Sequence, residues 1–165
     1  MELLIVRHAI ACERDAERWP DDRERPLSRR GVLRARQAAR GVRKLMRRPL
    51  CVLSSPLLRA QQTAAILSES AGWPRASLSP LLAPEASPAA VLALLARSHE
   101  SCVALVGHEP GLGRLLMSCL PAGRGAAAFQ MRKMGIAVVG FDGAARAGHG
   151  TLRMLVPPRL LRAVR

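Results

Sequence analysis

The chain has 165 residues, of which 49% are hydrophobic, and a formal net charge of +14 at pH 7. This length and composition exclude a wholly disordered chain and predict a single domain over residues 1–165. Because the chain has only two Trp, two Phe and no Tyr, it offers few platforms on which single-stranded nucleic acid could stack. We therefore expect no nucleic acid partner.

The positive charge has two interpretations. It can attract an anionic partner, or it can be compositional, since every basic residue except Lys44 and Lys133 is Arg, as a GC-rich coding sequence would produce. The second is favoured because the basic residues are spread along the chain, but it leaves room for a positively charged face beside an anionic site. No signal peptide is evident and the longest apolar run, 89–96, is too short to span a bilayer. We expect a cytoplasmic monomer without membrane contact.

The predicted elements alternate between strands and helices. The first strand, 3–6, is a continuous apolar run of the kind buried on both faces of a parallel sheet. A charged loop follows at 10–28, and Ser28 caps a helix over 29–47. The remaining predicted strands lie at 50–55, 102–107, 135–141 and 151–156, with a short extended piece at 77–79. Helices are predicted at 57–71, which Pro56 starts and Gly72 ends, at 89–98 and at 111–119, and a Gly/Ala loop at 121–128. The helix at 89–98 is strongly apolar and should be well covered. Residues 159–165 are expected to fray. This order predicts an α/β fold whose mostly parallel sheet is covered on both faces and has an antiparallel edge.

Three of these strands end in residues that suit a phosphate site. The first is followed by Arg7 and His8, the second leads into Arg59 in the first turn of a helix, and the third is followed by His108. In a parallel sheet these ends share one edge, where open α/β sheets bind their ligands. One guanidinium group can donate two parallel hydrogen bonds to the oxygens of a phosphate, and a helix N-terminus adds partial positive charge.

Histidine is the natural nucleophile of such a site. The neighbouring Arg charges disfavour imidazolium, so the His8 ring keeps a lone pair for in-line attack on phosphorus. Arg7, Arg59 and His108 would stabilise the transferring group, while Arg25 could reach over the pocket from its loop. Water would then hydrolyse the phosphohistidine enzyme. This chemistry requires no metal or other cofactor, and we expect none.

Three segments together resemble the histidine phosphatase superfamily, and within it the short SixA-like phosphohistidine phosphatases. These segments are Arg-His-Ala-Ile-Ala at 7–11, Ser-Ser-Pro-Leu-Leu-Arg-Ala-Gln-Gln-Thr-Ala at 54–64 and Gly-His-Glu-Pro at 107–110; residues 25–31 are also similar to that branch. The resemblance implies a three-layer α/β/α sandwich like phosphoglycerate mutase. It also implies His8 as nucleophile, with Arg7, Arg59 and His108 forming the phosphate pocket. The implied substrate is phosphohistidine on a protein such as a histidine phosphotransfer domain.

The general acid is left open by the sequence. Ester hydrolysis in this superfamily uses a carboxylate, whereas the imidazole of phosphohistidine leaves easily once it is protonated. Glu85 lies roughly where such an acid is expected and Glu109 follows His108 directly, but an ordinary carboxylate near the start of a helix is the favoured interpretation of each. A functional Glu85 would favour a small phosphoester or phosphoramidate metabolite as the substrate. A third alternative is a non-catalytic module that binds polyanions.

Overall fold

The central sheet determines where the site lies. The computed structural model describes residues 1–121 and 130–164, and among these residues six strands form one sheet in the order β3-β2-β4-β1-β5-β6. Strands β3, β2, β4 and β1 run parallel, whereas β5 and β6 are antiparallel to their neighbours. Their bounds are β1 Glu2–Arg7, β2 Cys51–Ser54, β3 Ser77–Leu78, β4 Cys102–Gly107, β5 Ile136–Gly140 and β6 Thr151–Val156. The predicted, mostly parallel sheet with an antiparallel edge is confirmed.

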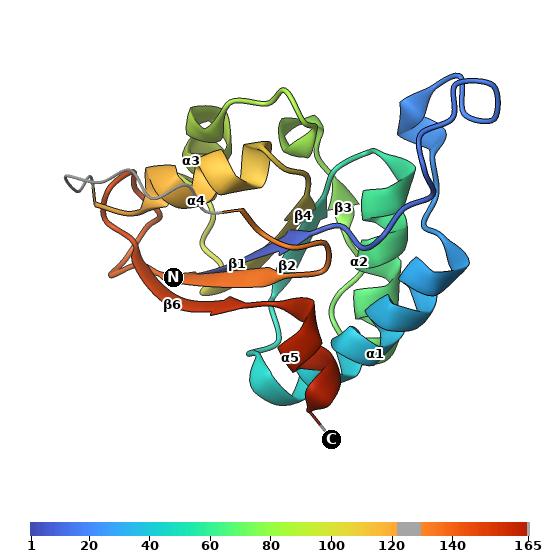
Figure 1. Cartoon of the computed structure of the whole chain (residues 1–165). Helices are drawn as coiled ribbons and strands as arrows, with labels where there is room; N and C mark the ends of the chain where they lie inside the picture. Colours follow the sequence, from blue (N-terminus) through green and yellow to red (C-terminus); the bar gives the residue numbers. More distant parts are fainter. Residues whose placement is uncertain (122–129, 165) are drawn as a thin grey trace.

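Helices cover both faces of this sheet (Figure 1). One face carries α1 (Arg29–Leu45), α2 (Leu58–Ala71) and α5 (Pro158–Ala163), and the other carries α3 (Pro88–Ala96) and α4 (Gly111–Cys119). Alternate side chains of β1 enter two separate apolar clusters, with Leu4 and Val6 facing α1 and α2, and Leu3 and Ile5 facing α3 and α4. The three-layer α/β/α sandwich is therefore confirmed. No helix among the described residues is long and apolar enough to cross a membrane.

Helix ends follow the signals in the sequence. The Ser28 side chain accepts a hydrogen bond from the Gly31 N–H at 3.0 Å and caps α1. Helix α2 ends at Gly72, whose φ of 72° is left-handed. The start of α2 differs slightly from the prediction, since its N-cap is Leu57 and Pro56 lies just outside. The predicted loop at 121–128 falls, apart from Pro121, outside the described residues.

Two predictions about helix packing need correction. The expectation that 159–165 frays is wrong for most of this segment, because α5 runs to Ala163 and its Leu161 is fully buried against α1. A Cβ atom on Gly41 of α1 would overlap the Leu161 carbonyl oxygen, so the missing side chain allows α5 to dock there. Helix α3 is less covered than predicted. It buries Val91, Leu92 and Leu95 on one side but leaves Leu94 38% exposed, since it packs mainly against α4.

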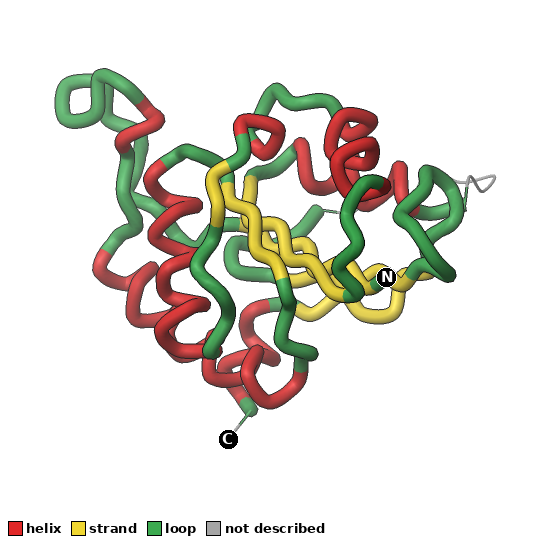
Figure 2. Tube along the Cα trace, turned by 180° about the vertical axis from the view of Figure 1, so that it is seen from behind, coloured by secondary structure: helices red, strands yellow, loops and turns green. Residues whose placement is uncertain are grey.

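The long loop between β1 and α1 is the remaining feature that shapes the site. It projects from the body of the molecule in both views (Figure 1, Figure 2). It contains a short 3-10 helix, η1 (Asp22–Glu24), and the bridge between Ala11 and Leu27 closes its base. A second 3-10 helix, η2 (Pro80–Leu82), follows β3.

Candidate active site

Three neighbouring parallel strands bring the predicted residues together. His8 follows β1, Ser55 follows β2 and His108 follows β4. The His8 N–H donates to the Gly107 carbonyl oxygen at 2.9 Å, and the Ser55 N–H donates to the Val106 carbonyl oxygen at 2.9 Å. The sheet ladder therefore continues one residue past the strands, and residues from distant parts of the sequence meet at one edge, as predicted.

The His8 ring is held with one nitrogen free. Its Nδ1 lies 2.7 Å from the Ala9 carbonyl oxygen, and because a carbonyl can only accept, Nδ1 carries the proton. The lone pair is then on Nε2. The following peptide is also fixed, since the Ala9 N–H donates to Thr63 Oγ1 at 3.0 Å and that hydroxyl donates to the Arg59 carbonyl oxygen at 2.7 Å. This arrangement is what a nucleophilic imidazole needs.

His108 lies beside His8, with ring centroids 4.9 Å apart and planes tilted by 51°. Its Nε2 is 2.8 Å from Ser55 Oγ, which also accepts the Leu57 N–H at 3.3 Å. We assign the Ser55 hydroxyl proton to the bond with Nε2, which leaves the His108 proton on Nδ1. That buried Nδ1 has no partner among the described residues. It is therefore available as a hydrogen-bond donor.

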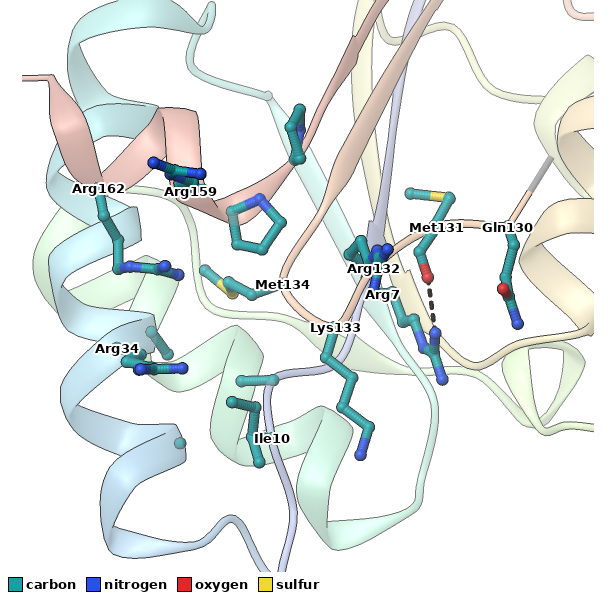
Figure 3. Close-up of a pocket in the computed structure, with 15 residues that line it drawn as sticks. Arg7, Ile10, Arg34, Gln130, Met131, Arg132, Lys133, Met134, Arg159 and Arg162 are labelled. Atoms are coloured by element: carbon teal, nitrogen blue, oxygen red, sulfur yellow. Dashed lines mark hydrogen bonds between the residues drawn. The ribbon is translucent and has the colours of Figure 1, made fainter.

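Three arginines surround the two histidines. Arg7 Nη1 donates to the Met131 carbonyl oxygen at 2.6 Å (dashed line in Figure 3). Asp22 holds the other two: its Oδ1 accepts from Arg25 Nε at 2.7 Å and its Oδ2 lies 3.0 Å from Arg59 Nη2. Within the described part of the chain, Arg7 Nε and Arg59 Nε are buried without an acceptor. Buried donors left unpaired are costly, so their gathering here marks a site suited to an anion.

Both histidines are neutral at physiological pH. Burial lowers the pKa of His8 to about 3, with smaller contributions from His108, Arg59 and Arg7. Burial also lowers the pKa of His108 to about 3, assisted by the arginine charges. The sequence predicted a neutral His8 but attributed it to the arginines. The main cause is instead the loss of solvation at the covered sheet edge.

These side chains line a cleft of about 710 Å³. All five predicted residues are among its lining: Arg7, His8, Arg25, Arg59 and His108. A neutral imidazole with an outward lone pair, opposed by guanidinium groups and a second imidazole, can accept a phosphoryl group and stabilise its charge.

Comparison with known proteins agrees with this geometry. The profile of the histidine phosphatase superfamily (branch 1) matches residues 3–83. An uncharacterised protein of Picosynechococcus sp. is 39% identical over 116 residues, which are 68% of this chain and 69% of that protein. The chain belongs to the histidine phosphatase superfamily. The protein histidine phosphatase SixA, solved with tungstate, is 28% identical to this chain with a TM-score of 0.83, covering 98% of this chain and 99% of that one. A SixA protein from Agrobacterium tumefaciens shares the fold at 22% identity and a TM-score of 0.77, over 95% and 97% of the two chains. The chain is thus SixA-like, and its superfamily implies phosphatase chemistry.

The carboxylates near the cleft differ in their surroundings. Glu85 is exposed and is not among the residues that line the cleft. Glu109 does line it, but its carboxylate accepts the Gly113 N–H at 3.0 Å and the Met131 N–H at 2.8 Å. Glu109 therefore secures α4 and the segment that binds Arg7. The other carboxylate among the described lining residues is the exposed Glu13.

Sequence reasoning missed two residues that organise the site. Ser55 belongs to the segment 54–64 that resembles the superfamily, but nothing in the sequence links it to His108, which lies 53 positions away. Asp22 is 37 positions from Arg59 and is one of several acids in the loop. Its role depends on how the loop folds back, and no local pattern signals that.

Proposed function

We propose that this protein removes phosphate from phosphohistidine on another protein, through a covalent intermediate on His8. The observation that carries the proposal is the state of the carboxylates in the cleft. Glu109 is engaged by two backbone N–H groups and Glu85 lies elsewhere, which leaves the exposed Glu13 as the other carboxylate among the described lining residues. A phosphoester needs a proton donor for its alkoxide, whereas a protonated imidazole leaves without one, so this cleft suits a P–N bond.

The reaction follows from the geometry in two steps. First, the His8 Nε2 lone pair attacks phosphorus, the bond between phosphorus and the substrate imidazole breaks, and the imidazole leaves with its proton. Arg7, Arg59 and the Nδ1–H of His108 stabilise the equatorial oxygens during the transfer. Second, water attacks phosphorus and the bond to His8 Nε2 breaks. The water oxygen ends in the phosphate, and His8 returns to its neutral form.

Two further findings support the proposal. The solved SixA holds tungstate, a tetrahedral oxyanion like phosphate. In this chain, three buried nitrogens without a partner in the described structure belong to residues of the same cleft: Arg7 Nε, Arg59 Nε and His108 Nδ1. The partner we propose is a phosphorylated protein such as a histidine phosphotransfer domain.

The decisive experiment measures phosphate release from a phosphorylated histidine phosphotransfer domain in EDTA, beside p-nitrophenyl phosphate. We expect release from the domain and little from the ester. His8→Ala should lower the rate by at least about 1000-fold while keeping the fold and the affinity for phosphate. Wild-type turnover in that variant would contradict the assignment of the nucleophile. Arg59→Ala should weaken both phosphate binding and turnover, because the same guanidinium binds the phosphoryl group in the ground state and in the transition state.

A second candidate, a phosphatase for a small phosphoester, is favoured by one observation. Glu13, an exposed carboxylate in the loop between β1 and α1, is among the residues that line the cleft. Faster hydrolysis of the ester than of phosphohistidine, lost in Glu13→Gln, would establish this alternative.

A further inference from the structure

A second depression lies beside the active cleft (Figure 3). It has a volume of about 590 Å³ and is formed by α1, α5 and the segment before β5. Three of its lining residues, Arg7, Ile10 and Lys133, also line the active cleft, so the two adjoin. We call it the basic groove and define it by Arg34, Lys133, Arg159 and Arg162 on its rim and by Ile10 and Met134 on its floor.

The charge of the basic groove is not compensated locally. Its four rim cations, and Arg132 next to them, make no ion pair or side-chain hydrogen bond with any residue in the described part of the chain. No Asp or Glu occurs among the described residues that line it. Elsewhere, by contrast, Arg36 on the same helix α1 pairs with Glu69 at 3.7 Å. A concave surface that gathers several unpaired cations attracts anionic groups.

The floor of the basic groove is apolar and fixed. Met134 is 3% exposed and has a φ of 64°, a left-handed conformation that costs a residue with a Cβ atom about 1 kcal/mol or more. Its N–H is shared between the carbonyl oxygens of Arg7 at 3.0 Å and His8 at 3.2 Å. The floor is therefore tied to the catalytic strand itself. Gly31 completes one wall, because its missing side chain allows α1 to contact the Ile10 backbone.

We propose that the basic groove binds an acidic, partly apolar segment of the phosphoprotein substrate, next to the residue that carries the phosphoryl group. The inference rests on the proposed function for its choice of partner. Carboxylates of the segment pair with Arg34, Arg159 and Arg162, while its apolar side chains cover the half-buried Ile10. A nucleic acid fits less well, because no aromatic side chain lines the groove and an apolar floor gives phosphates nothing to bind.

The first test measures binding without catalysis. A labelled peptide of Glu, Ala and Leu is titrated by fluorescence anisotropy in saturating inorganic phosphate, which occupies the active cleft. The groove variant is Arg34→Ala with Arg159→Ala, and its control is Arg40→Ala with Arg43→Ala, two exposed positions on α1 that do not line the groove. We expect the groove variant to raise Kd about tenfold and the control to leave it unchanged, as two lost charge pairs would. Equal affinities in the two variants would overturn the inference.

The second test separates this inference from the proposed function. For a phosphorylated phosphotransfer domain, the groove variant should raise KM about tenfold with kcat unchanged, while hydrolysis of free phosphohistidine stays at the wild-type rate. An unchanged KM would overturn the inference even if the phosphatase activity is present. If phosphohistidine is not hydrolysed at all but the peptide still binds through the basic groove, the proposed function is contradicted, whereas the inference that the groove binds an acidic segment is supported. Tighter binding of an oligonucleotide than of the peptide, lost in the groove variant, would replace the acidic segment with a nucleic acid.

Discussion

Asp22 holds Arg59 at two points: its carbonyl oxygen accepts from Nη1 at 2.7 Å and its carboxylate Oδ2 lies 3.0 Å from Nη2. The hydrogen bond from Arg25, together with the Arg59 charge, lowers the pKa of Asp22 below its ordinary value. The loop thus delivers an ionised carboxylate to the guanidinium that we assign to phosphate. This carboxylate orients Arg59 and at the same time neutralises part of its charge.

Asp22→Asn should therefore strengthen binding of inorganic phosphate. Asparagine retains an oxygen for Arg59 but removes the negative charge, and for a carboxylate whose side chain is 42% exposed a gain of about fivefold in affinity is reasonable. The measurement is the inhibition constant of phosphate. Asp21→Asn is the matched control, because Asp21 caps the Arg23 N–H and takes part in no ion pair of the described residues. Equal inhibition constants in the two variants would show that Asp22 has no electrostatic effect on the site.

Ser55 should position His108. Removing its hydroxyl in Ser55→Ala leaves His108 Nε2 without its partner at 2.8 Å, so the proton is no longer confined to Nδ1. We expect kcat to fall about tenfold with little change in KM, because the Nδ1–H stabilises charge that develops on the phosphoryl oxygens in the transition state. Nitrogen NMR of the His108 ring should show the mixed tautomer. Ser55→Thr should restore both properties, whereas Ser54→Ala, a neighbouring buried serine, should leave them unchanged. A wild-type ring spectrum in Ser55→Ala would contradict this role.

The fold and the convergence of the site were predictable because the signals are local. Continuous apolar runs ending in Arg7-His8 or in His108 predict buried parallel strands, and parallel strands place their carboxyl ends at one edge. The pairing of β1 with β4 makes residues about a hundred positions apart neighbours. The nucleophile and its surroundings follow from this topology without any detail of side-chain packing.

The features that escaped prediction all depend on contacts between distant segments. Docking of α5 depends on Leu161 meeting Gly41, and a helix of six residues, two of them arginine, gives no periodicity strong enough to show it. The bond from Asp22 to Arg59 and the unpaired charges around the basic groove likewise need the folded chain. For the same reason, the sequence could not distinguish Glu109, held by backbone N–H groups, from a free acid.

Gly41→Ala should destabilise the fold through α5. The added Cβ overlaps the Leu161 carbonyl oxygen, which belongs to backbone and cannot rotate away. We expect the free energy of unfolding in urea to fall by about 2 kcal/mol, as overpacking in a core does. Gly111→Ala is the control, since a Cβ there meets the Pro84 carbonyl oxygen at an ordinary 3.4 Å. Equal losses in the two variants would show that the contact between α1 and α5 is not tightly packed.

The two buried histidines should make the protein less stable as the pH falls from about 6.5 to 5. In the folded chain burial lowers the pKa of His8 and of His108 from 6.5 to about 3. The unfolded chain therefore binds two protons in this range that the folded chain does not, and each histidine removes about 1.5 kcal/mol of stability. Asp22, whose folded pKa is also lowered from 3.8, contributes only at more acidic pH.

Urea titrations at both pH values test this expectation. His8→Asn and His108→Asn should each halve the pH-dependent loss, and the double variant should abolish most of it. His99→Asn serves as the control, because His99 lies outside the cleft and should leave the loss at its wild-type size. A pH dependence that is unchanged in the double variant would mean that His8 and His108 become charged in the folded protein. His8 would then have its Nε2 lone pair only above the ordinary imidazole pKa, so turnover should fall below about pH 6.5 instead of persisting to pH 5.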